Sequence, residues 1–475
     1  MKFINSSLWF GRFFAIVFVL MASTIAWPTE VVSNYDGVRC LTLRDAVDIA
    51  LASNRNLIAV SNLFQNSDLS LQAARSAYDL TIYPSANLGA SDGNENVGAG
   101  ILLDKKFYSG VDMTIFPSIT RSNDMHSGAI GFALGVPLLR GRGEVVNLDA
   151  IKSSAFSLKS AEHSLYQARI STVIATISAI YNIIEQKEIA HLLENQVAAM
   201  KGHAEAANLK KDVGLATAMD VYRAMIRLKD VQDQLSTTLN DLASDRDTLK
   251  GILALPLSER IEVIAPLEWN DISMPLDEAV QTALENRIEI VHARDALEET
   301  ERKALVAKHN LLPQLDFVLD YERYSKNDHL SQAANLTQDR WSINLVSTTD
   351  WARTREKTTY QQSLLNVRNA KLAVESKKDE VITEVRHQIE ILKKWKERIE
   401  IKNDQIRQAV GKQKLSRIKF DHGMADNFDL IEAESELFQA RANLISVKTE
   451  LIVNQYKLRS VLGILFDRKG KLNLG

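Results

Sequence analysis

Apolar residues recur every seven positions along two stretches of the chain. In the C-terminal stretch, which follows Gly423, the heptad positions are Leu437, Leu444, Leu451 and Leu458. The stretch that follows Gly214 repeats them as Leu228, Leu235, Leu242 and Leu249. A heptad repeat keeps one apolar stripe facing a neighbouring helix, which is the signature of a coiled coil. The pattern therefore predicts two related coiled-coil helices, over about 217–253 and 420–463.

The two heptad helices belong to a longer internal repeat. The segment LTLRDAVDIAL at 41–51 matches MPLDEAVQTAL at 274–284 at its apolar positions. Two copies of one pattern indicate that the halves share one architecture. We therefore expect a first structural repeat over 27–273 and a second over 274–475.

Each repeat is expected to contain one helix before its strands and a long helical segment after them. The first helices are predicted over 41–79 and 274–310, and the long segments over 144–253 and 350–463. Neither long segment contains a proline. At 1.5 Å per residue, the first helix of each long segment is a rod of about 100 Å. Such a rod suits a protein that bridges a gap, although a filament or tether would also explain it.

Between the helices the apolar pattern changes to a period of two, which predicts strands within 80–140 and 313–347. The ordinary interpretation is an antiparallel sheet with one face on a soluble core. The coiled-coil helices bury their own seams, so they offer such a sheet no apolar cover. A lipid-facing band opposite a polar lumen explains the same alternation. The expected lipid-facing residues are Ile130, Phe132, Leu134, Leu315, Phe317, Leu319, Trp341 and Ile343.

Residues on the opposite face, such as Gly131 and Asn344, should accept arginine with an effect mainly on conductance. The chain offers four clear strands, or six if 102–116 forms an additional hairpin. An open sheet cannot lie in hydrocarbon with unpaired edges. The membrane interpretation therefore requires several chains to close a barrel.

Composition excludes several other classes of protein. The formal net charge of −3 and the absence of a basic stripe with aromatics argue against nucleic-acid binding. The single cysteine, Cys40, excludes an internal disulfide framework and a multi-cysteine metal site. The nine histidines are scattered, and no catalytic or phosphate-binding motif occurs. We therefore expect no enzyme, no metal and no cofactor.

The N-terminus has the pattern of an export signal. Lys2 and Arg12 precede the apolar segment FFAIVFVLMASTIA, which ends in the small residues Thr24 and Ala26. An uncleaved anchor is the alternative, but the segment is shorter than the roughly 20 residues that span a bilayer. We expect 1–26 to be a signal peptide and 29–40 to be an irregular lead-in.

The duplicated order of helix, strand pair, long helix, glycine turn and heptad helix resembles the TolC-type outer-membrane efflux proteins, the outer membrane factors of Gram-negative bacteria. The segment PLLRGRG at 137–143, which closes the first strand pair, adds to this resemblance. The resemblance covers essentially the whole chain after the signal. It implies a mainly α fold with β structure, an α-barrel tunnel across the periplasm and a homotrimer. It also implies a 12-stranded transmembrane β-barrel with four strands from each chain.

The resemblance further implies an exit duct in the outer membrane for a tripartite efflux pump or a type I secretion system. Its partners would be outer-membrane lipid, a periplasmic adaptor and an inner-membrane transporter of the RND, ABC or MFS type. The alternative from another class is a soluble periplasmic coiled-coil adaptor or scaffold.

In this family the tunnel narrows at its periplasmic tip, beside the turn glycines, which here are Gly214 and Gly423. The residues at the matching positions of the aperture are Asp429, Glu432, Asp220 and Arg223. A purely local explanation is that carboxylates in the first turn of a helix are favoured by its dipole. The family closes the aperture with a tyrosine and an arginine whose positions are occupied here by Phe420 and Ala425. We therefore expect closure to depend on Asp220 and Arg223.

Overall fold

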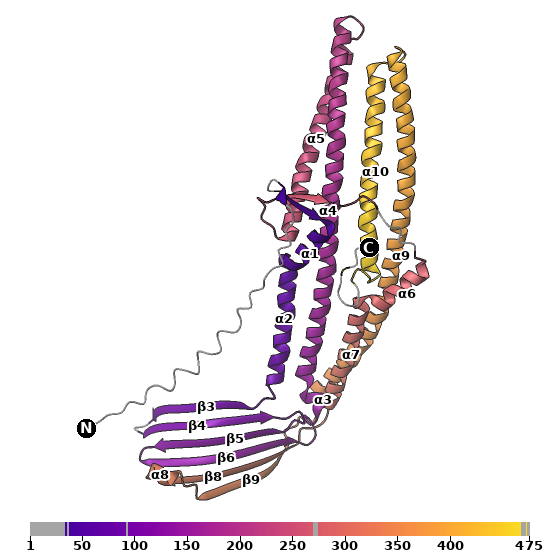
Figure 1. The fold of residues 1–475 in the computed structure, drawn as a ribbon. Coiled ribbons are helices and arrows are strands. Elements are labelled where there is room, and N and C mark those ends of the chain that lie inside the picture. Colours follow the sequence, from indigo (N-terminus) through magenta and orange to yellow (C-terminus); the bar gives the residue numbers. More distant parts are fainter. Residues whose placement is uncertain (1–33, 36–37, 92–93, 269–273, 467–471, 473–475) are drawn as a thin grey trace, which may run out of the picture.

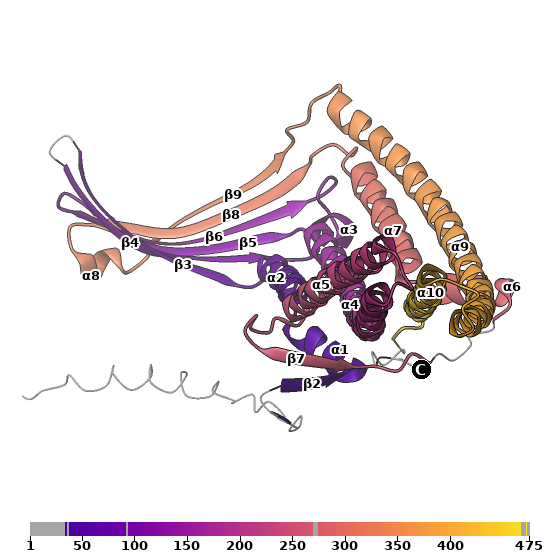
Figure 2. The same ribbon diagram turned by 90° about the horizontal axis from the view of Figure 1, so that it is seen from above.

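The computed structural model describes residues 34–35, 38–91, 94–268, 274–466 and 472. Long helices stand side by side, and one sheet leaves their lower end to one side (Figure 1). Viewed from above, the sheet is twisted and curved (Figure 2), as expected for antiparallel strands. The chain is mostly helical with a separate sheet, which confirms the expected fold class.

Ten helices are assigned within the described residues. Those of the first half are α1 (Leu43–Ser53), α2 (Arg55–Ser76), α3 (Glu144–Asn147), α4 (Asp149–Asp212) and α5 (Ala218–Leu253). Those of the second half are α6 (Leu276–Asn286), α7 (Ile288–His309), α8 (Leu330–Ala333), α9 (Thr354–Asp421) and α10 (Asn427–Val461). The longest, α4 and α9, contain 64 and 68 residues, so each spans about 100 Å.

The first helix of each half is broken, whereas the sequence analysis expected one continuous helix. Thr42 caps α1, because its hydroxyl accepts from the backbone N–H of Asp45. The next break lies at Asn54, whose side chain caps α2 by accepting from Leu57 N–H at 3.0 Å. Arg287 separates α6 from α7 in the same extended conformation, with φ −69° and ψ 121°. Apolar periodicity continues across both breaks, which is why the pattern does not reveal them.

At each break, the helix that follows the break starts next to the C-terminal end of a helix from later in the chain. Asn54 donates to the carbonyl of Ile252 at 2.8 Å, so the end of α5 meets the start of α2. In the second half, Arg287 donates to the carbonyl of Val461 at 3.1 Å, so the end of α10 meets the start of α7. Each pair of shorter helices therefore forms one stacked rod beside a long helix.

The heptad leucines lie in the seams between these rods. Leu249 and Leu451 are fully buried, and Leu458 is nearly so. The more distal Leu228 is only half-buried and packs at the edge of a cluster around Val231. The predicted coiled-coil packing is therefore tightest near the middle of the rods.

A small sheet lies on one side of this middle region (Figure 1), with the order β1-β2-β7. Its strands are β1 (Asn34–Tyr35), β2 (Val38–Thr42) and β7 (Arg260–Ile264), and β2 runs parallel to β7. The expectation of an irregular lead-in over 29–40 is therefore wrong at β1 and from Val38 onward, because β2 finds its partner far along the chain. Cys40 lies in β2 and is half-buried. The expected signal peptide, 1–26, lies outside the described residues.

The large sheet has six antiparallel strands in the order β3-β4-β5-β6-β8-β9. They are β3 (Thr81–Ser91), β4 (Asn94–Lys106), β5 (Asp112–Ser122), β6 (Met125–Pro137), β8 (Asp316–Asn327) and β9 (Gln338–Val346). The contribution of four strands is therefore wrong, and the six-stranded alternative is confirmed. A hairpin does span 102–116, and it connects β4 to β5.

The strand registers place the large apolar residues on one face. Phe132 pairs with Ile115 on one side and with Tyr321 on the other. Ile343 pairs with Leu319, which in turn pairs with Leu134. The remaining strand residues expected to face lipid lie on the same face: Ile130, Phe317 and Trp341. Leu315 comes just before β8, where its carbonyl accepts from Leu138 N–H at 2.8 Å.

The opposite face carries mostly small and polar residues, together with the aromatic side chains of Tyr83, Phe116 and Tyr324. A Cβ built on Gly131 would lie 2.0 Å from the ring of Phe116. Gly131 therefore makes room for this ring, and an arginine at position 131 would have to displace it. Asn344, on the same face of β9, is exposed.

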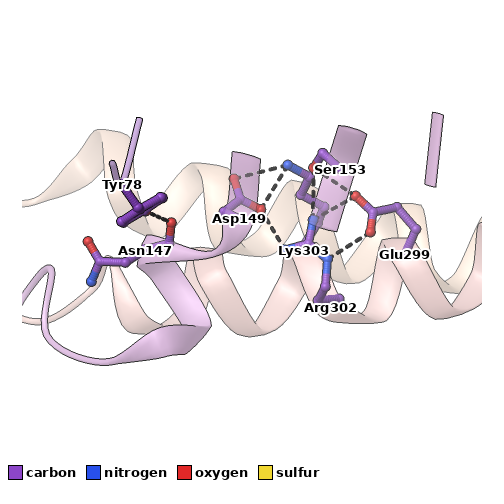
Figure 3. A network of polar contacts seen from close by, with 7 residues as sticks. All are labelled: Tyr78, Asn147, Asp149, Ser153, Glu299, Arg302 and Lys303. Carbon is purple, nitrogen blue, oxygen red and sulfur yellow. Dashed lines mark hydrogen bonds and ion pairs between the residues drawn. The ribbon is translucent and has the colours of Figure 1, made fainter. Parts of the chain in front are cut away.

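Charged residues join α4 to α7 close to the sheet (Figure 3). Arg302 donates to Asp149 and Glu299, each at 2.6 Å, and to Ser153 at 2.9 Å. Lys303 also donates to Asp149, at 2.9 Å. Burial alone raises the pKa of Asp149, but the hydrogen bonds from Lys303 and Arg302 outweigh it and lower that pKa. The network fixes the lower ends of the rods relative to each other.

Along the described part of the chain, no helix is both long and apolar enough to cross a membrane.

Candidate functional site at the tip of the rods

The ends of the rods farthest from the sheet are closed by two helical turns of identical design (Figure 1). The backbone φ is +79° at Gly214, between α4 and α5, and +73° at Gly423, between α9 and α10. Leu215 N–H donates to Lys210 O, and Met424 N–H donates to Lys419 O, each at 2.7 Å. Both turns are Schellman motifs, in which glycine adopts the left-handed conformation at no steric cost.

The helices that leave these turns are capped in different ways. At the start of α5, Thr217 and Asp220 form a capping box, with Thr217 N–H donating to the Asp220 carboxylate at 2.8 Å. Hydrogen bonds from the Thr217 side chain and backbone lower the pKa of Asp220. At the start of α10, Asp426 makes the cap by accepting from Asp429 N–H at 2.9 Å. The capping box therefore explains why position 220 carries an aspartate. Glu432 lies beyond the first turn of α10, so helix capping does not explain a carboxylate at that position.

A groove of about 560 Å³ separates the first turns of α5 and α10. Asp220, Arg223, Phe428 and Glu432 all line it. The Arg223 guanidinium lies 5.7 Å from the centre of the Phe428 ring, in cation–π range. Asp429 lines a second hollow around the turns, which Asp220 also borders. The structure thus brings the four residues expected at the aperture to one place.

Phe420, at the position of the family's tyrosine, has a partner within its own chain. The ammonium group of Lys210 lies 3.8 Å from the centre of the Phe420 ring. This cation–π contact joins the last turn of α4 to the last turn of α9. Ala425 also borders the hollow around the turns, but its methyl group cannot donate a hydrogen bond.

One ion pair and one histidine–carboxylate contact near the groove were not expected from the sequence. Lys412 of α9 donates to Glu436 at 2.7 Å. This bond, with attraction to Glu432 and Asp429, raises the pKa of Lys412. The spacing of positions 429, 432 and 436 puts these carboxylates on one helix face, so the sequence did contain a signal for Glu436.

The histidine–carboxylate contact joins α4 to α10. His203 Nε2 lies 2.8 Å from Glu434 Oε2, and both side chains are largely buried. Its partners are 231 positions apart, and nothing in the local pattern relates them. Within the described ranges, no group of three or more histidine, cysteine, aspartate or glutamate residues is placed to hold a metal.

Comparisons with known proteins agree with this architecture. Residues 279–464 match the sequence model of a family described as outer membrane efflux protein. No curated protein matches the chain at the level of sequence.

Solved structures match nearly the whole chain. The CmeC outer membrane channel of Campylobacter jejuni is 16% identical with a TM-score of 0.68, and the match covers 90% of this chain and 86% of that one. VceC, an outer membrane protein of Vibrio cholerae, is 14% identical with a TM-score of 0.69, covering 89% and 96%. The open state of the MtrE outer membrane channel of Neisseria gonorrhoeae is 17% identical with a TM-score of 0.64, covering 89% of each chain. At these identities the likeness shows the fold.

The arrangement of the rods and the sheet is similar to the fold of solved outer membrane channels. In addition, residues 279–464, most of the second repeat, are similar in sequence to the outer membrane efflux protein family. The alternative of a soluble adaptor or scaffold does not account for the sheet or for the family match.

Proposed function

We propose that three copies of this chain form one exit duct, which an inner-membrane transporter of the RND, ABC or MFS type feeds through a periplasmic adaptor. Residues 1–26 would direct export, and the repeats 27–273 and 274–475 would each supply half of one protomer's wall. The free ends of the rods support docking on the adaptor, because large apolar side chains are exposed at both turns. Leu215 is 78% exposed and Met424 is 70% exposed. The same tip would serve a type I secretion system.

We further propose that Asp429 and Glu432 narrow the tip and select cations. The observation that supports this most directly is their convergence with Asp220 and Arg223 at the end of the rods. In a trimer, the pair would place six carboxylates around one axis. Repulsion among like charges in a narrow space favours the binding of cations. Closure would depend on Arg223, which contacts Phe428 at the start of α10.

The test is single-channel recording in planar bilayers. Asp429→Ala with Glu432→Ala should raise conductance and weaken block by multivalent cations, because both the charge and the bulk of the ring are removed. Arg223→Ala should also raise conductance, while leaving cation block in place. The matched control is Glu205→Ala with Asp212→Ala, which removes two carboxylates per chain from α4 at the same end of the rods.

Wild-type conductance and wild-type cation block in the Asp429/Glu432 variant would show that the ring lies elsewhere. An equal loss of block in the control would show that general surface charge, rather than this pair, attracts the cations. Unchanged conductance in Arg223→Ala would remove that residue from the closing mechanism.

A further inference from the structure

We infer that the membrane barrel of this protein has 18 strands, closed by pairing of β3 in one copy with β9 in the next. The inference rests on the proposed trimer, since six strands per chain give 18 only if three copies assemble. It differs from the 12-stranded barrel that the resemblance implied. The additional wall is the hairpin β3–β4, which comes before the four strands that are clear from the sequence.

Strands β3 and β4 continue the apolar face of the sheet. Ile82 pairs with Leu103, and Leu88 pairs with Val97. Leu103 in turn pairs with Ile115, which belongs to the apolar face of β5. The apolar band therefore extends from β9 across the whole sheet to β3. A hairpin that lay outside the barrel would need no such continuity.

The two edge strands of the sheet, β3 and β9, would each need a further partner in a membrane. Each of β3 and β9 is paired on one side only, and unpaired backbone groups are costly in hydrocarbon. Apolar side chains are nevertheless exposed on both edge strands: Leu88 at 83%, Trp341 at 69% and Leu345 at 65%. Lipid exposure accounts for those side chains, and only a further strand satisfies the backbone groups.

The directions of the strands also allow the barrel to close. All neighbours in the sheet are antiparallel, so the first and last of the six strands run in opposite directions. When one copy follows another around an axis, β9 meets the next β3 in antiparallel orientation. The ladder can therefore continue from copy to copy without a change of pairing type, and the closed barrel has no edge.

Pro84 in β3 is the main objection, because proline donates no hydrogen bond and is usual on edge strands. The sheet already tolerates this defect in its interior. Pro117 lies in the middle of β5, where the β4–β5 ladder is interrupted after the pair Gly100–Ser118 and resumes in the same register at the pair Leu103–Ile115. One proline per ladder is thus compatible with a continuous wall in this protein.

The perimeter of an 18-stranded barrel is close to that of the ring of helical rods. Strands about 4.8 Å apart and tilted by about 40° each occupy about 6.3 Å of perimeter, so 18 strands give about 113 Å. Twelve strands give about 75 Å by the same relation. A trimer has twelve helical rods, and packing at about 9 to 10 Å gives a ring of about 110 to 120 Å. The wider barrel meets this ring with little taper.

A 12-stranded barrel would require β5 of one copy to pair with β9 of the next. The edge of β5 that would make this contact is occupied by β4, from Asn96–Ser122 to Lys106–Asp112. The hairpin β3–β4 would first have to leave the sheet. The two arrangements therefore predict different neighbours for β9, and disulfide cross-linking can separate them.

The experiment places cysteines on the face opposite the apolar band, after Cys40→Ser removes the native thiol. Ser342→Cys in β9 is combined in turn with Ser85→Cys, Asn87→Cys or Gly89→Cys in β3, which covers the possible registers between copies. Within one chain, β3 and β9 are five strand spacings apart, about 24 Å along the sheet. A disulfide requires Cβ atoms within about 4.5 Å, so only the neighbouring copy can provide the partner.

The competing pairs combine Ser342→Cys with Thr114→Cys or Ser118→Cys in β5. These strands are three spacings apart within one chain, about 14 Å, so they too can react only between copies. Samples are oxidised in the membrane, boiled without reductant and separated on a denaturing gel. A covalent trimer that dithiothreitol converts to monomer reports neighbouring strands.

We expect at least one β3–β9 pair to give covalent trimers and both β5–β9 pairs to remain monomeric. Covalent trimers from β5, or monomers from every β3 pair, would overturn the 18-stranded barrel. The native mass in detergent, measured on the same samples, separates the two hypotheses. A trimer that fails to cross-link at β3 refutes only the wider barrel, whereas a chain that is not trimeric refutes the proposed assembly as well.

Discussion

Arg287 holds the joint between the stacked helices α10 and α7, and its removal should loosen that joint but not the corresponding joint of the first repeat. Its guanidinium donates to the carbonyl of Val461 at 3.1 Å and to Glu289 at 2.9 Å. It also forms an ion pair with Glu384 of α9 at 2.9 Å. The Arg287 side chain is only 12% exposed. The substitution Arg287→Ala therefore affects the end of α10, the start of α7 and their contact with α9.

The cost can be estimated from these three contacts. A hydrogen bond from a charged donor contributes about 1.5 to 3 kcal/mol. The ion pair with Glu384 contributes at most about 1 kcal/mol, because that carboxylate is 48% exposed. Glu289 stays in the first turn of α7, where water and the helix dipole replace part of its lost partner. We expect a total of about 3 kcal/mol, or about 150-fold in the local opening equilibrium.

Hydrogen–deuterium exchange of the trimer in detergent measures this local opening directly. In Arg287→Ala, exchange should rise by up to about 150-fold in peptides covering 284–292 and 456–464. Arg287→Lys retains the charge without the planar fork, so we expect an intermediate rise.

The first repeat offers a matched control, because Asn54 bonds to Ile252 at the corresponding joint. Asn54→Ala loses one hydrogen bond and one helix cap, together about 2 kcal/mol. Its effect should be confined to 51–58 and 249–255. Unchanged exchange at 456–464 in Arg287→Ala would refute the reasoning, as would an equal rise at both joints in either variant.

Two further predictions concern the lower end of the rods and the sheet. Arg302→Ala should destabilise the contact between α4 and α7 by about 2 to 3 kcal/mol. In the wild type, the pKa values of Asp149 and Glu299 are lowered, so both carboxylates stabilise the folded state at any pH above their ordinary pKa values. This stabilisation is lost as the pH falls through the lowered pKa values of the folded state. The melting temperature of Arg302→Ala should therefore decline less between pH 7 and pH 3.5, and a parallel decline would contradict this. On the sheet, Phe132→Arg should reduce heat-stable trimer in outer membranes, at a cost of about 2 to 4 kcal/mol per chain near the bilayer centre. Asn344→Arg should leave assembly intact, and equal losses in both variants would refute the lipid-facing assignment.

The long-range order of this fold was predictable because it rests on strong periodic patterns. The heptads at Leu249 and Leu451 locate seams that are fully buried, and the alternation around Phe132 locates a sheet. The breaks at Asn54 and Arg287 were not predictable, because the apolar period continues through them. Tertiary contacts with the ends of α5 and α10 determine these positions. The hairpin β3–β4 was expected only as part of the six-stranded alternative, because its alternation uses many small residues.

The site at the tip was predictable in its composition and less so in its contacts. The repeat located both glycine turns, and the two related helix starts indicated Asp220 and Asp429. The contact of Phe420 with Lys210 depends on two helices that end at the same height, and local sequence contains no such information. The same holds for His203 and Glu434, which meet only because α4 and α10 pack side by side.

The width of the barrel determines which substitutions can affect transport. Conductance through pores in series is limited by the narrowest one, because resistance rises as the cross-section falls. If the barrel has 18 strands, its backbone diameter is about 36 Å, against about 24 Å for 12 strands. Three arginines at position 344 would obstruct the narrower barrel and leave the wider one largely open. The expectation that Asn344→Arg mainly alters conductance therefore belongs to the narrow barrel. In the wide barrel, conductance should respond to the carboxylates of Asp429 and Glu432 at the far end of the rods and hardly at all to residue 344.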